Sequence, residues 1–589
     1  MGSLAKRLSV LFSDAFTACG YDATHGEVVV SNRPDLCQFQ CNGALAAAKQ
    51  YGVNPRQVAE QVVEKVSSQN LFSDLSIAGP GFINLTLTDG FLASHVADIA
   101  QDKHFGCDSA DPPLRIIVDY GGPNVAKPLH VGHLRAAIIG ESLKRICRFL
   151  GNDTLGDVHL GDWGLQMGML ITELQRRSPA LPYFDAAYTG PYPETSPVSI
   201  TDLEEMYPTA SERAKTDSEA MEASKLATVD LQAGRPGYLA LWRHFQEISI
   251  ADLKEDYVKL NVQFDLWLGE SDTQNRIPGL IERLKVAGFA VESQGALVVE
   301  VVDPSDTRPI PPLMLVKSDG AVLYGTTDLA TIDQRVEDYH PDLILYVVDN
   351  RQSDHFHQVF TAAHKTGVAP KSVGLEHNGF GTMNGQDGKP FKTRAGGVMK
   401  LKDLIQMVTD KATERIAEIE SIRGYSEDEK TEMARMVGVA ALKYADLMNH
   451  RTKNYVFDLD RFSSFEGRTG PYLLYTAVRI KSILRRAAEN GVEPGALLAP
   501  SGTAERELFL KLTEFPDVIG LAFDTRAPNP ICEYTYQLAT LYNRFYHECH
   551  ILNETDHARR GSWLSASHLA LDVLITSLDL LGIEAPERM

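Results

Sequence analysis

Residues 114–151 read LRIIVDYGGPNVAKPLHVGHLRAAIIGESLKRICRFLG, and this stretch decides the fold. Its apolar start predicts a buried strand over Leu114–Asp119. Glycine and proline break the chain at Gly121–Asn124. Apolar residues then recur every three or four positions, which predicts a helix over His133–Leu150 that ends before Gly151. A strand, a tight turn and a helix in this order are typical of the start of a nucleotide-binding parallel sheet.

Further apolar runs downstream of this unit predict the rest of the sheet. Buried strands are expected at Ala296–Val302, Pro312–Val316 and Leu343–Val348, and they alternate with helical stretches. This alternation favours one doubly wound, Rossmann-like parallel sheet in a domain over residues 111–410. Clustered prolines and a charged helical run interrupt the domain, so we expect a surface insertion over about 178–262.

The region before the sheet has the pattern of a separate α+β domain over residues 1–110. An alternating strand is expected at Phe82–Leu87, after the break at Gly79–Gly81. Asp111-Pro112-Pro113 marks the boundary with the sheet. Three helices are predicted in this domain, at Lys6–Ala18, Cys41–Gln50 and Pro55–Val66.

The region after the sheet is predicted to be almost entirely helical. A helical connector over 411–465 leads to an α-helical bundle over 466–589. Because linkers usually separate autonomous cores, we expect the sheet domain to stay folded without this bundle. The fold class is therefore multi-domain α/β, with an N-terminal α+β domain and a C-terminal α-helical bundle.

Composition narrows the classes of function. The chain has 589 residues, of which 44% are hydrophobic and 23% charged, so disordered, collagen and coiled-coil classes are excluded. A net charge of −21 excludes a generic polyanion binder, and nucleic acid would have to meet local basic patches. The seven cysteines form no CxxC pair, which predicts core residues in a reducing compartment. With no apolar window of eighteen residues and no signal-peptide pattern, we expect a cytoplasmic protein without a membrane partner.

Two histidines carry the first chemical signal. His130 and His133 flank Gly132 at the predicted start of the helix, where free N–H groups and the helix dipole favour anions. Both imidazoles could donate hydrogen bonds to phosphoryl oxygens. Gly132 would let a flat ligand approach the backbone, and Lys127 adds a positive charge to the same turn.

The histidine pair has other interpretations. An isolated pair with this spacing is more often a solvated helix start, and a zinc site lacks both the HExxH pattern and a visible third ligand. No Walker sequence is present, since Gly388-Lys389 is followed by Pro390, and no GxGxxG follows a strand. The pair therefore predicts a phosphate site of another kind, without a protein-bound metal.

The surrounding motifs strengthen that interpretation. Residues 119–135 resemble the "HIGH" signature of class I aminoacyl-tRNA synthetases, and in detail the arginyl-tRNA synthetase family. The resemblance covers essentially the whole chain. It continues through Phe39–Gly43, Ala78–Asn84, His159–Gly168, Gly269–Ser271, Lys317–Gly320, Tyr324–Ala330, Val348–Phe356 and Gly467–Tyr472.

One departure concerns the second class I signature, "KMSKS", which is absent. Phe391-Lys392-Thr393-Arg394 stands in its place. The resemblance implies that Lys127, His130, His133, Lys392 and Arg394 are catalytic. It also implies that ATP, with Mg²⁺ on its phosphates, contacts Lys127, Gly132, His133, Met383 and Lys392.

A site for arginine needs carboxylates held in a plane, because the guanidinium is a planar fork of donors. Asp328 follows Tyr324 by four residues, so on a helix the two share a face. The resemblance implies that arginine contacts Asp119, Asn124, His130, Tyr324, Asp328 and Gln352, and which of these bind the head group stays open. Asp354 and His355 are expected to be structural.

The tRNA contacts follow from weaker signals. Arg479 and Arg485 belong to a basic face that could equally be solvated, while Asn543 and Tyr546 lie in a helical stretch that mixes basic and aromatic groups. Phe82 and Asn84 alternate along a strand and so share one sheet face. The resemblance implies that this face contacts the tRNA elbow and that the C-terminal bundle reads the anticodon.

The expected function is therefore that of an arginine–tRNA ligase. The resemblance implies ATP-dependent activation of L-arginine to arginyl-adenylate and transfer to the terminal adenosine of tRNA(Arg), by a monomer that activates arginine only with tRNA bound. A nucleotidylyltransferase is disfavoured by the long helical C-terminal region. A non-catalytic tRNA-binding relative is disfavoured because His130, His133 and Asp328 are all present.

Overall fold

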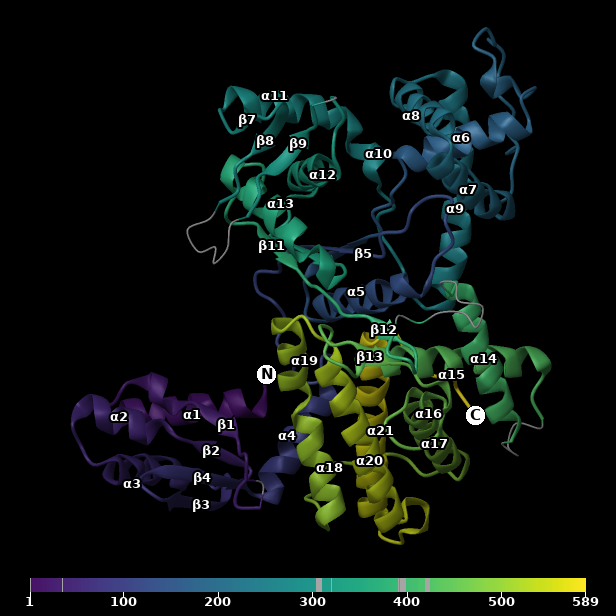
Figure 1. Cartoon of the computed structure of the whole chain (residues 1–589). Helices are drawn as coiled ribbons and strands as arrows, with labels where there is room; N and C mark the ends of the chain where they lie inside the picture. The colour runs from purple at the N-terminus through teal and green to yellow at the C-terminus, as the bar shows by residue number, and fades with distance from the viewer. Residues whose placement is uncertain are drawn as a thin grey trace.

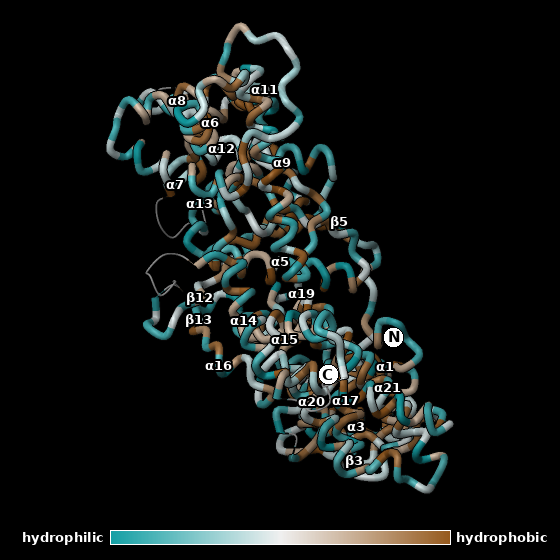
Figure 2. The backbone as a smooth tube through the Cα atoms, turned by 90° about the vertical axis from the view of Figure 1, so that its right-hand side faces the viewer, coloured by the Kyte–Doolittle hydropathy of each residue, from teal (hydrophilic) through white to brown (hydrophobic). Residues whose placement is uncertain are grey.

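The molecule is elongated and branched (Figures 1 and 2). Its computed structural model describes residues 2–589 except 34, 303–309, 319, 390, 392–398 and 419–423. A parallel sheet lies at the centre, with two lobes on one side of it and a helical bundle on the other. The N-terminal domain projects from the flank of that bundle.

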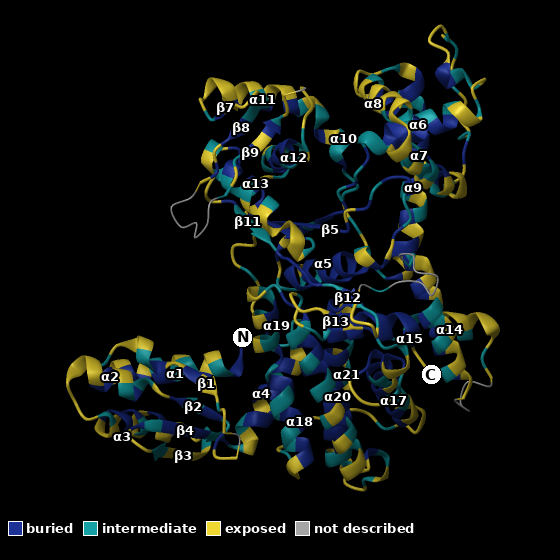
Figure 3. Ribbon diagram, in the orientation of Figure 1, coloured by how far each residue is buried: buried dark blue, intermediate teal, exposed yellow. Residues whose placement is uncertain are grey.

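The central sheet has four parallel strands in the order β11-β10-β5-β6. They span Arg115–Tyr120 (β5), Asp153–Asp157 (β6), Leu343–Val347 (β10) and Gly374–His377 (β11). The predicted strand–turn–helix unit is confirmed, since β5 leads through the glycine-rich turn into α5 (Val131–Phe149). Both β5 and α5 are largely buried, as Figure 3 shows.

Two strands predicted for this sheet belong elsewhere. The segments at 296–302 and 312–316 contain β8 (Ala296–Val299) and β9 (Leu313–Val316), which pair antiparallel with each other. With β7 (Ala290–Ser293) they form a separate three-stranded sheet. The hairpin turn at Gln294-Gly295, where both residues have positive φ, joins β7 to β8 antiparallel and so places β8 in this sheet.

The two lobes are built from the segments that connect strands of the central sheet. One lobe carries the antiparallel sheet with α10 (Glu270–Thr273), α11 (Ile277–Val286), α12 (Tyr324–Tyr339) and α13 (Ser353–Thr366). The other is helical, with α6 (Leu165–Arg177), α7 (Ile200–Thr216), α8 (Ser218–Gln232) and α9 (Pro236–Lys259). This helical lobe contains most of the predicted insertion.

The N-terminal domain is α+β, as predicted. Its antiparallel sheet has the order β1-β2-β4-β3, from Val28–Val30 (β1), Phe39–Cys41 (β2), Phe72–Ala78 (β3) and Phe82–Leu87 (β4). Helices α1 (Leu4–Ala18), α2 (Gly43–Tyr51) and α3 (Pro55–Val66) cover one face. The domain buries a hydrophobic core of its own, and α4 (Asp89–Gln101) joins it to the rest.

The C-terminal third of the chain is helical, which confirms the predicted bundle. Its helices are α14 (Leu401–Ala417), α15 (Glu427–Leu447), α16 (Leu459–Phe462), α17 (Gly470–Glu489), α18 (Thr503–Thr513), α19 (Phe515–Asp524), α20 (Asn529–Cys549) and α21 (His557–Leu580). A two-stranded sheet, β12 (Met383–Asn384) with β13 (Tyr455–Val456), lies between α5 and these helices. No described helix has the length and hydropathy that a membrane crossing needs.

One hydrophobic core runs from α5 into the bundle without a break. Side chains of α5, α14, α15 and α17–α21 all belong to it. Polar contacts reinforce the junction, since Ser142 Oγ donates to Leu580 O at 2.7 Å and Arg145 pairs with Asp579 at 2.6 Å. This shared core speaks against the expectation that the sheet domain stays folded without the bundle.

Candidate active site

A cavity of about 680 Å³ opens at the carboxyl ends of β5 and β10, where open parallel sheets bind their ligands. It brings together most of the residues that the sequence singled out. Its lining includes Asp119, Asn124, His130, Gly132, His133, Tyr324, Asp328, Gln352 and Met383. Lys392 and Arg394 lie outside the described residues.

The two histidines cap the start of α5 with each other's help. The backbone N–H of Gly132 donates to His130 Nδ1 at 3.0 Å, and that of His130 donates to His133 Nδ1 at 3.1 Å. The ring centroids are 3.9 Å apart. Because each Nδ1 accepts a hydrogen bond, the proton of each neutral ring is on Nε2. Both rings therefore keep one N–H donor, at Nε2, for a ligand.

Burial keeps these rings neutral. It lowers the pKa of His133 to about 3, with the neighbouring His130 and Lys127 adding to the effect. Burial and then the charge of Lys127 also lower the pKa of His130. At neutral pH the histidine turn thus offers two hydrogen-bond donors and no imidazolium charge.

Gly132 has a local role beside the predicted one. A Cβ added there would lie 2.7 Å from Cε1 of His130, closer than such atoms approach. The missing side chain therefore makes room for the His130 ring, and because Gly132 also lines the cavity, the close approach of a flat ligand stays a prediction.

Lys127 stands beside the histidine turn but is not among the residues that line the cavity. Its Nζ lies 4.3 Å from the centre of the Tyr207 ring on α7, within the range of a cation–π contact. Its charge is nevertheless felt at both histidines, as their lowered pKa values show.

The acidic end of the cavity is formed by α12 and its neighbours. As predicted, Tyr324 and Asp328 lie on one face of a helix, and both line the cavity. His355 Nε2 contacts Asp328 Oδ2 at 2.5 Å, and its ring centre is 4.7 Å from that of Tyr324. His355 thereby fixes the orientation of the carboxylate that faces the cavity.

Glu270, at the start of α10, is a lining residue that the sequence analysis quoted but did not assign. Burial raises the pKa of its carboxyl, and the nearby charge of Asp328 raises it further. The two carboxyls thus share one end of the cavity, a suitable place for a cation. The only sequence signal for Glu270 was its position in the Gly269–Ser271 motif.

Asp119 is tied into a buried ion network that the sequence did not reveal. Arg335 of α12, which is fully buried, donates from Nη2 to Asp119 Oδ2 and to Asp157 Oδ2, both at 2.6 Å. Its Nε and Nη1 have no partner among the described residues. Arg335 therefore holds both carboxylates, and its single positive charge offsets one of their two negative charges.

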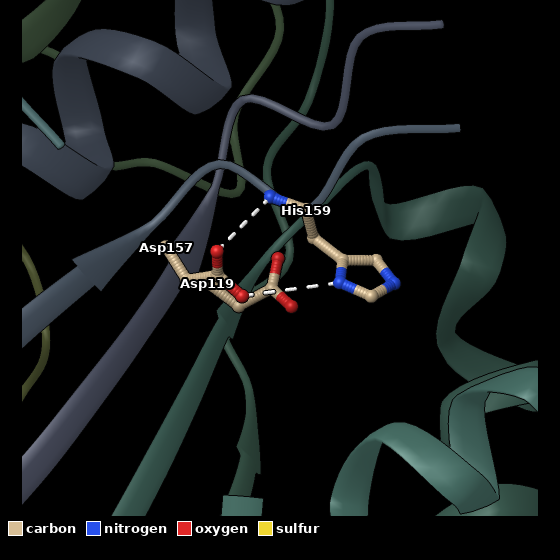
Figure 4. Close-up of side chains that lie close together, drawn as sticks. All are labelled: Asp119, Asp157 and His159. Atoms are coloured by element: carbon tan, nitrogen blue, oxygen red, sulfur yellow. Dashed lines mark hydrogen bonds and ion pairs between the residues drawn. The ribbon is translucent and has the colours of Figure 1, made fainter. Parts of the chain in front are cut away.

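His159 completes a group with these two aspartates (Figure 4). Its Nδ1 lies 3.8 Å from Asp157 Oδ2, and ligand atoms of all three residues lie within 4.8 Å of one another. Such a group can hold a metal ion, but here the guanidinium of Arg335 already supplies the positive charge. The donor set fits an internal ion network better than a metal site.

The two amides predicted to bind arginine line the cavity at different walls. Asn124 belongs to the turn after β5 and forms a parallel bridge with Gly161. A Cβ on Gly161 would lie 2.5 Å from Asn124 Oδ1, so the glycine lets this amide pack closely. Gln352 follows β10 and is exposed at the mouth of the cavity.

The candidate tRNA residues of the bundle divide into two kinds. Arg479 Nη1 donates to Asn543 Oδ1 at 2.7 Å, and Asn543 Nδ2 donates to Tyr472 Oη at 3.0 Å, so these groups join α17 to α20. Arg485 is exposed and Tyr546 half-buried, which leaves both accessible.

On the N-terminal domain, Phe82 and Asn84 lie on one face of β4, as predicted, opposite the buried face. Asn84 is itself largely buried and accepts a hydrogen bond from Gln40 Nε2 at 2.8 Å. Gln40 lies within the Phe39–Gly43 motif, but its residue type alone gave no signal for this contact.

Three family models match the chain. The class I (R) tRNA synthetase catalytic domain matches residues 95–459, the DALR anticodon binding domain matches 473–589, and the arginyl tRNA synthetase N-terminal domain matches 4–87. The boundary regions between these matches fall near Asp89 and near Thr469.

Individual proteins agree with these models over the full length. An arginine–tRNA ligase of Alkaliphilus oremlandii is 53% identical over 590 residues, and one of Maricaulis maris is 50% identical, each with 100% of both chains covered. Solved arginyl-tRNA synthetases of Plasmodium falciparum and Thermus thermophilus share the fold, with TM-scores of 0.80 and 0.78, at 24% and 23% identity over 100% of both chains.

Proposed function

The chain belongs to the arginine–tRNA ligase family of class I aminoacyl-tRNA synthetases, and we propose that its central cavity is where arginine is activated. The activity is ATP-dependent aminoacylation of tRNA(Arg) with arginine. One observation carries the proposal. A single cavity holds two neutral histidine donors near one wall and a pair of carboxyls, Asp328 and Glu270, at another.

The acidic end binds the guanidinium of arginine. Asp328, oriented by His355, and Glu270 accept its N–H donors, while Tyr324 offers a ring or hydroxyl contact. Two carboxylates in a fixed arrangement suit a planar fork and suit the point charge of lysine less well. Arginine binding favours the ionised form of Glu270, because a cation lowers the pKa that burial has raised.

The head group of arginine lies toward the sheet. Asp119, which shares Arg335 with Asp157 and so keeps negative charge, accepts from the α-ammonium group. Asn124 and Gln352 complete the contacts to the ammonium and carboxylate groups, since amides both donate and accept. The carboxylate is thereby directed toward the histidine turn.

Adenylate formation needs no nucleophile from the protein. A carboxylate oxygen of arginine attacks the α-phosphorus in line, the bond to the bridging oxygen breaks, and pyrophosphate leaves. The Nε2–H groups of His130 and His133 donate to phosphoryl oxygens as their charge rises. Gly132 and Met383 border the nucleotide.

Positive charge for the phosphates comes from basic side chains and from the metal ion that accompanies ATP. Lys127 supplies it at the histidine turn, and Lys392 with Arg394 supply it from residues outside the described part. Mg²⁺ arrives with the nucleotide, while Arg335 binds both Asp119 and Asp157 and offsets half of their negative charge.

The tRNA spans the molecule from the N-terminal domain to the bundle. Phe82 and Asn84 face its elbow, Arg485 and Tyr546 contact the anticodon region, and the Arg479–Asn543 pair holds that surface in shape. We assign these roles to domains over residues 1–110, 111–410 and 466–589, with 411–465 as the connector. The enzyme acts as a monomer in the cytoplasm.

The test is Asp328→Asn, assayed by arginine-dependent pyrophosphate exchange in the presence of tRNA(Arg). Losing one hydrogen bond to a charged partner costs about 1.5–3 kcal/mol, so KM for arginine should rise about 10- to 100-fold while KM for ATP stays constant. Asp338→Asn is the matched control, because Asp338 lies on the same helix and pairs with Arg276 at the surface. Unchanged arginine kinetics in Asp328→Asn would refute the pocket assignment.

A further inference from the structure

Helix α7 of the helical lobe contacts three lysines near the histidine turn, a pair through Glu204 and a single one through Tyr207. Glu204 Oε2 accepts from Lys400 Nζ at 2.7 Å, and its Oε1 accepts from Lys402 Nζ at 3.4 Å. Three residues further on, Tyr207 presents its ring to Lys127 Nζ at 4.3 Å. Residues three apart lie on one side of a helix, so a single turn of α7 makes all these contacts.

Both attachments are linked through the backbone to the histidines. Lys400 forms an antiparallel bridge with His130, and Leu401 N donates to Leu129 O at 2.8 Å. On the other side, the turn that carries Lys127 is pinned to the same lobe, because Ala126 N donates to Ser249 Oγ of α9 at 2.9 Å. The helical lobe therefore contacts the histidine turn at two places, through Lys400 and through Ala126.

The contacts of Glu204 and Tyr207 have different effects on the charge of the lysines that they hold. The side chain of Glu204 is only 13% exposed. Burial alone would raise its pKa, but the hydrogen bond and charge of Lys400, with Lys402, lower it. Glu204 is therefore ionised and neutralises Lys400. The acidic groups Asp252 and Asp256 of α9 also face Lys402.

Lys127 meets an aromatic ring instead of a carboxylate. The negative face of a ring attracts an ammonium without cancelling its charge, and it leaves N–H donors free for another acceptor. Since the histidines are neutral, Lys127 is a source of positive charge at the turn. A flexible lysine of this kind otherwise loses considerable side-chain entropy when it is fixed.

We propose that Tyr207 is a positioning residue that holds Lys127 in place for the phosphates of ATP, and that Glu204 anchors α7 so that the ring stays there. The inference rests on the proposed role of Lys127. It gives the helical lobe a part in the activation step, although no residue of α7 lines the cavity.

The test is a double-mutant cycle between Tyr207 and Lys127, read out by pyrophosphate exchange with tRNA(Arg) present. Tyr207→Leu keeps an apolar side chain but removes the ring, and should lower kcat/KM for ATP about 3- to 10-fold, the size of a cation–π contact. KM for arginine should not change. Tyr207→Phe keeps the ring and should restore most of the loss. In a Lys127→Met background, Tyr207→Leu should have no further effect.

Glu204→Gln should lower kcat/KM for ATP by a smaller factor, about 2- to 5-fold, because the ion pairs of Glu204 with Lys400 and Lys402 are lost. Glu205→Gln is its matched control. Glu205 is the next residue, carries the same charge and pairs with Arg177 on another side of α7, so its variant should behave as wild type. Thermal unfolding of each variant separates these effects from loss of fold, and Tyr207→Met serves as a second ring deletion if Tyr207→Leu is unstable.

Three outcomes would overturn the inference. These are a full additional loss from Tyr207→Leu in the Lys127→Met background, a Tyr207→Phe variant as impaired as Tyr207→Leu, and an effect confined to KM for arginine. A different result addresses the underlying role. If Lys127→Met alone leaves ATP use unchanged, the proposed function of Lys127 fails, whatever Tyr207 does.

Discussion

The N-terminal domain and the C-terminal bundle are attached to the central domain in opposite ways. The N-terminal domain closes its own hydrophobic core. Its junction includes the pair between Arg506 and Asp89, whose side chains are 24% and 47% exposed. The bundle has no such separate core, and Arg135 of α5 pairs with Asp446 of α15 at 2.9 Å with both side chains at most 2% exposed.

The difference shows that a domain boundary in sequence is not a boundary in packing. α5 is covered by the sheet on one side and by α21 on another, so its apolar residues belong to one core with the bundle. Residues 4–87, in contrast, could be cut away without opening that core. A segment can be removed without unfolding the rest only if it does not complete the hydrophobic core of the rest.

The largest expected effect comes from deleting each region in turn. A chain that ends at residue 465 should fail to fold, because α5, α14 and α15 lose the helices that cover them. A chain without residues 2–87 should stay folded and lose tRNA affinity instead. Circular dichroism and the cooperativity of thermal unfolding measure both. A cooperatively folded protein from the first deletion would break the comparison.

The buried ion pair should show the next largest effect. Asp446→Asn leaves the guanidinium of Arg135 buried without its counter-charge, which costs about 3–5 kcal/mol. Urea unfolding should report this as a lower free energy of unfolding at similar m-value. A loss below 1 kcal/mol would mean that the junction between α5 and α15 carries little of the stability.

A third prediction concerns the pH dependence of the same junction. Lys443 is fully buried and donates to Gly582 O at 2.7 Å, and burial lowers its pKa from 10.5 to about 7. Between these values the unfolded chain binds the extra proton, so stability rises with pH from about 7 to 10.5, by at most about 1.4 kcal/mol per unit.

Lys443→Met removes this proton linkage. The pH dependence of the free energy of unfolding, measured from pH 7 to 10, should therefore be flatter in the variant than in wild type. Parallel curves for the two proteins would contradict the assignment of the linkage to Lys443.

The smallest effect is expected at the N-terminal junction. Arg506→Ala removes the exposed pair with Asp89 and a hydrogen bond to Leu87 O at 2.8 Å. Exposed pairs contribute roughly 0–1 kcal/mol, so the free energy of unfolding should change by no more than about 1 kcal/mol. A loss as large as that of Asp446→Asn would erase the distinction between the two junctions.

Local signals in the sequence predicted local structure well. The β5–turn–α5 unit, α3 and β4 follow from apolar periodicity and from the prolines and glycines at their ends. The pairing of β8 with β9 was predicted wrongly, because an apolar run does not specify the direction of its neighbour. The turn at Gln294-Gly295 was an overlooked signal for the antiparallel pairing of β7 with β8, which already places β8 outside the parallel sheet.

The candidate site shows the same limit. His130 and His133 form a local unit, and spacing alone brings them together. Arg335 contacts Asp119 and Asp157 only through the tertiary fold, so no sequence pattern predicted these ion pairs. The Arg479–Asn543 bond likewise turns two expected surface groups toward each other. Long-range polar networks of this kind need the coordinates.

The hydrogen bond between Ser142 and Leu580 also sets a minimum time between the synthesis of α5 and its burial. The two residues are 438 positions apart, and a ribosome adds about 5–20 residues per second. The outer side of α5 therefore waits roughly 20–90 s for the segment that covers it. During that time the nascent chain exposes the apolar surface of α5, and such a surface is the kind that chaperones bind. We therefore expect that a chain that stops before Leu580 does not charge tRNA.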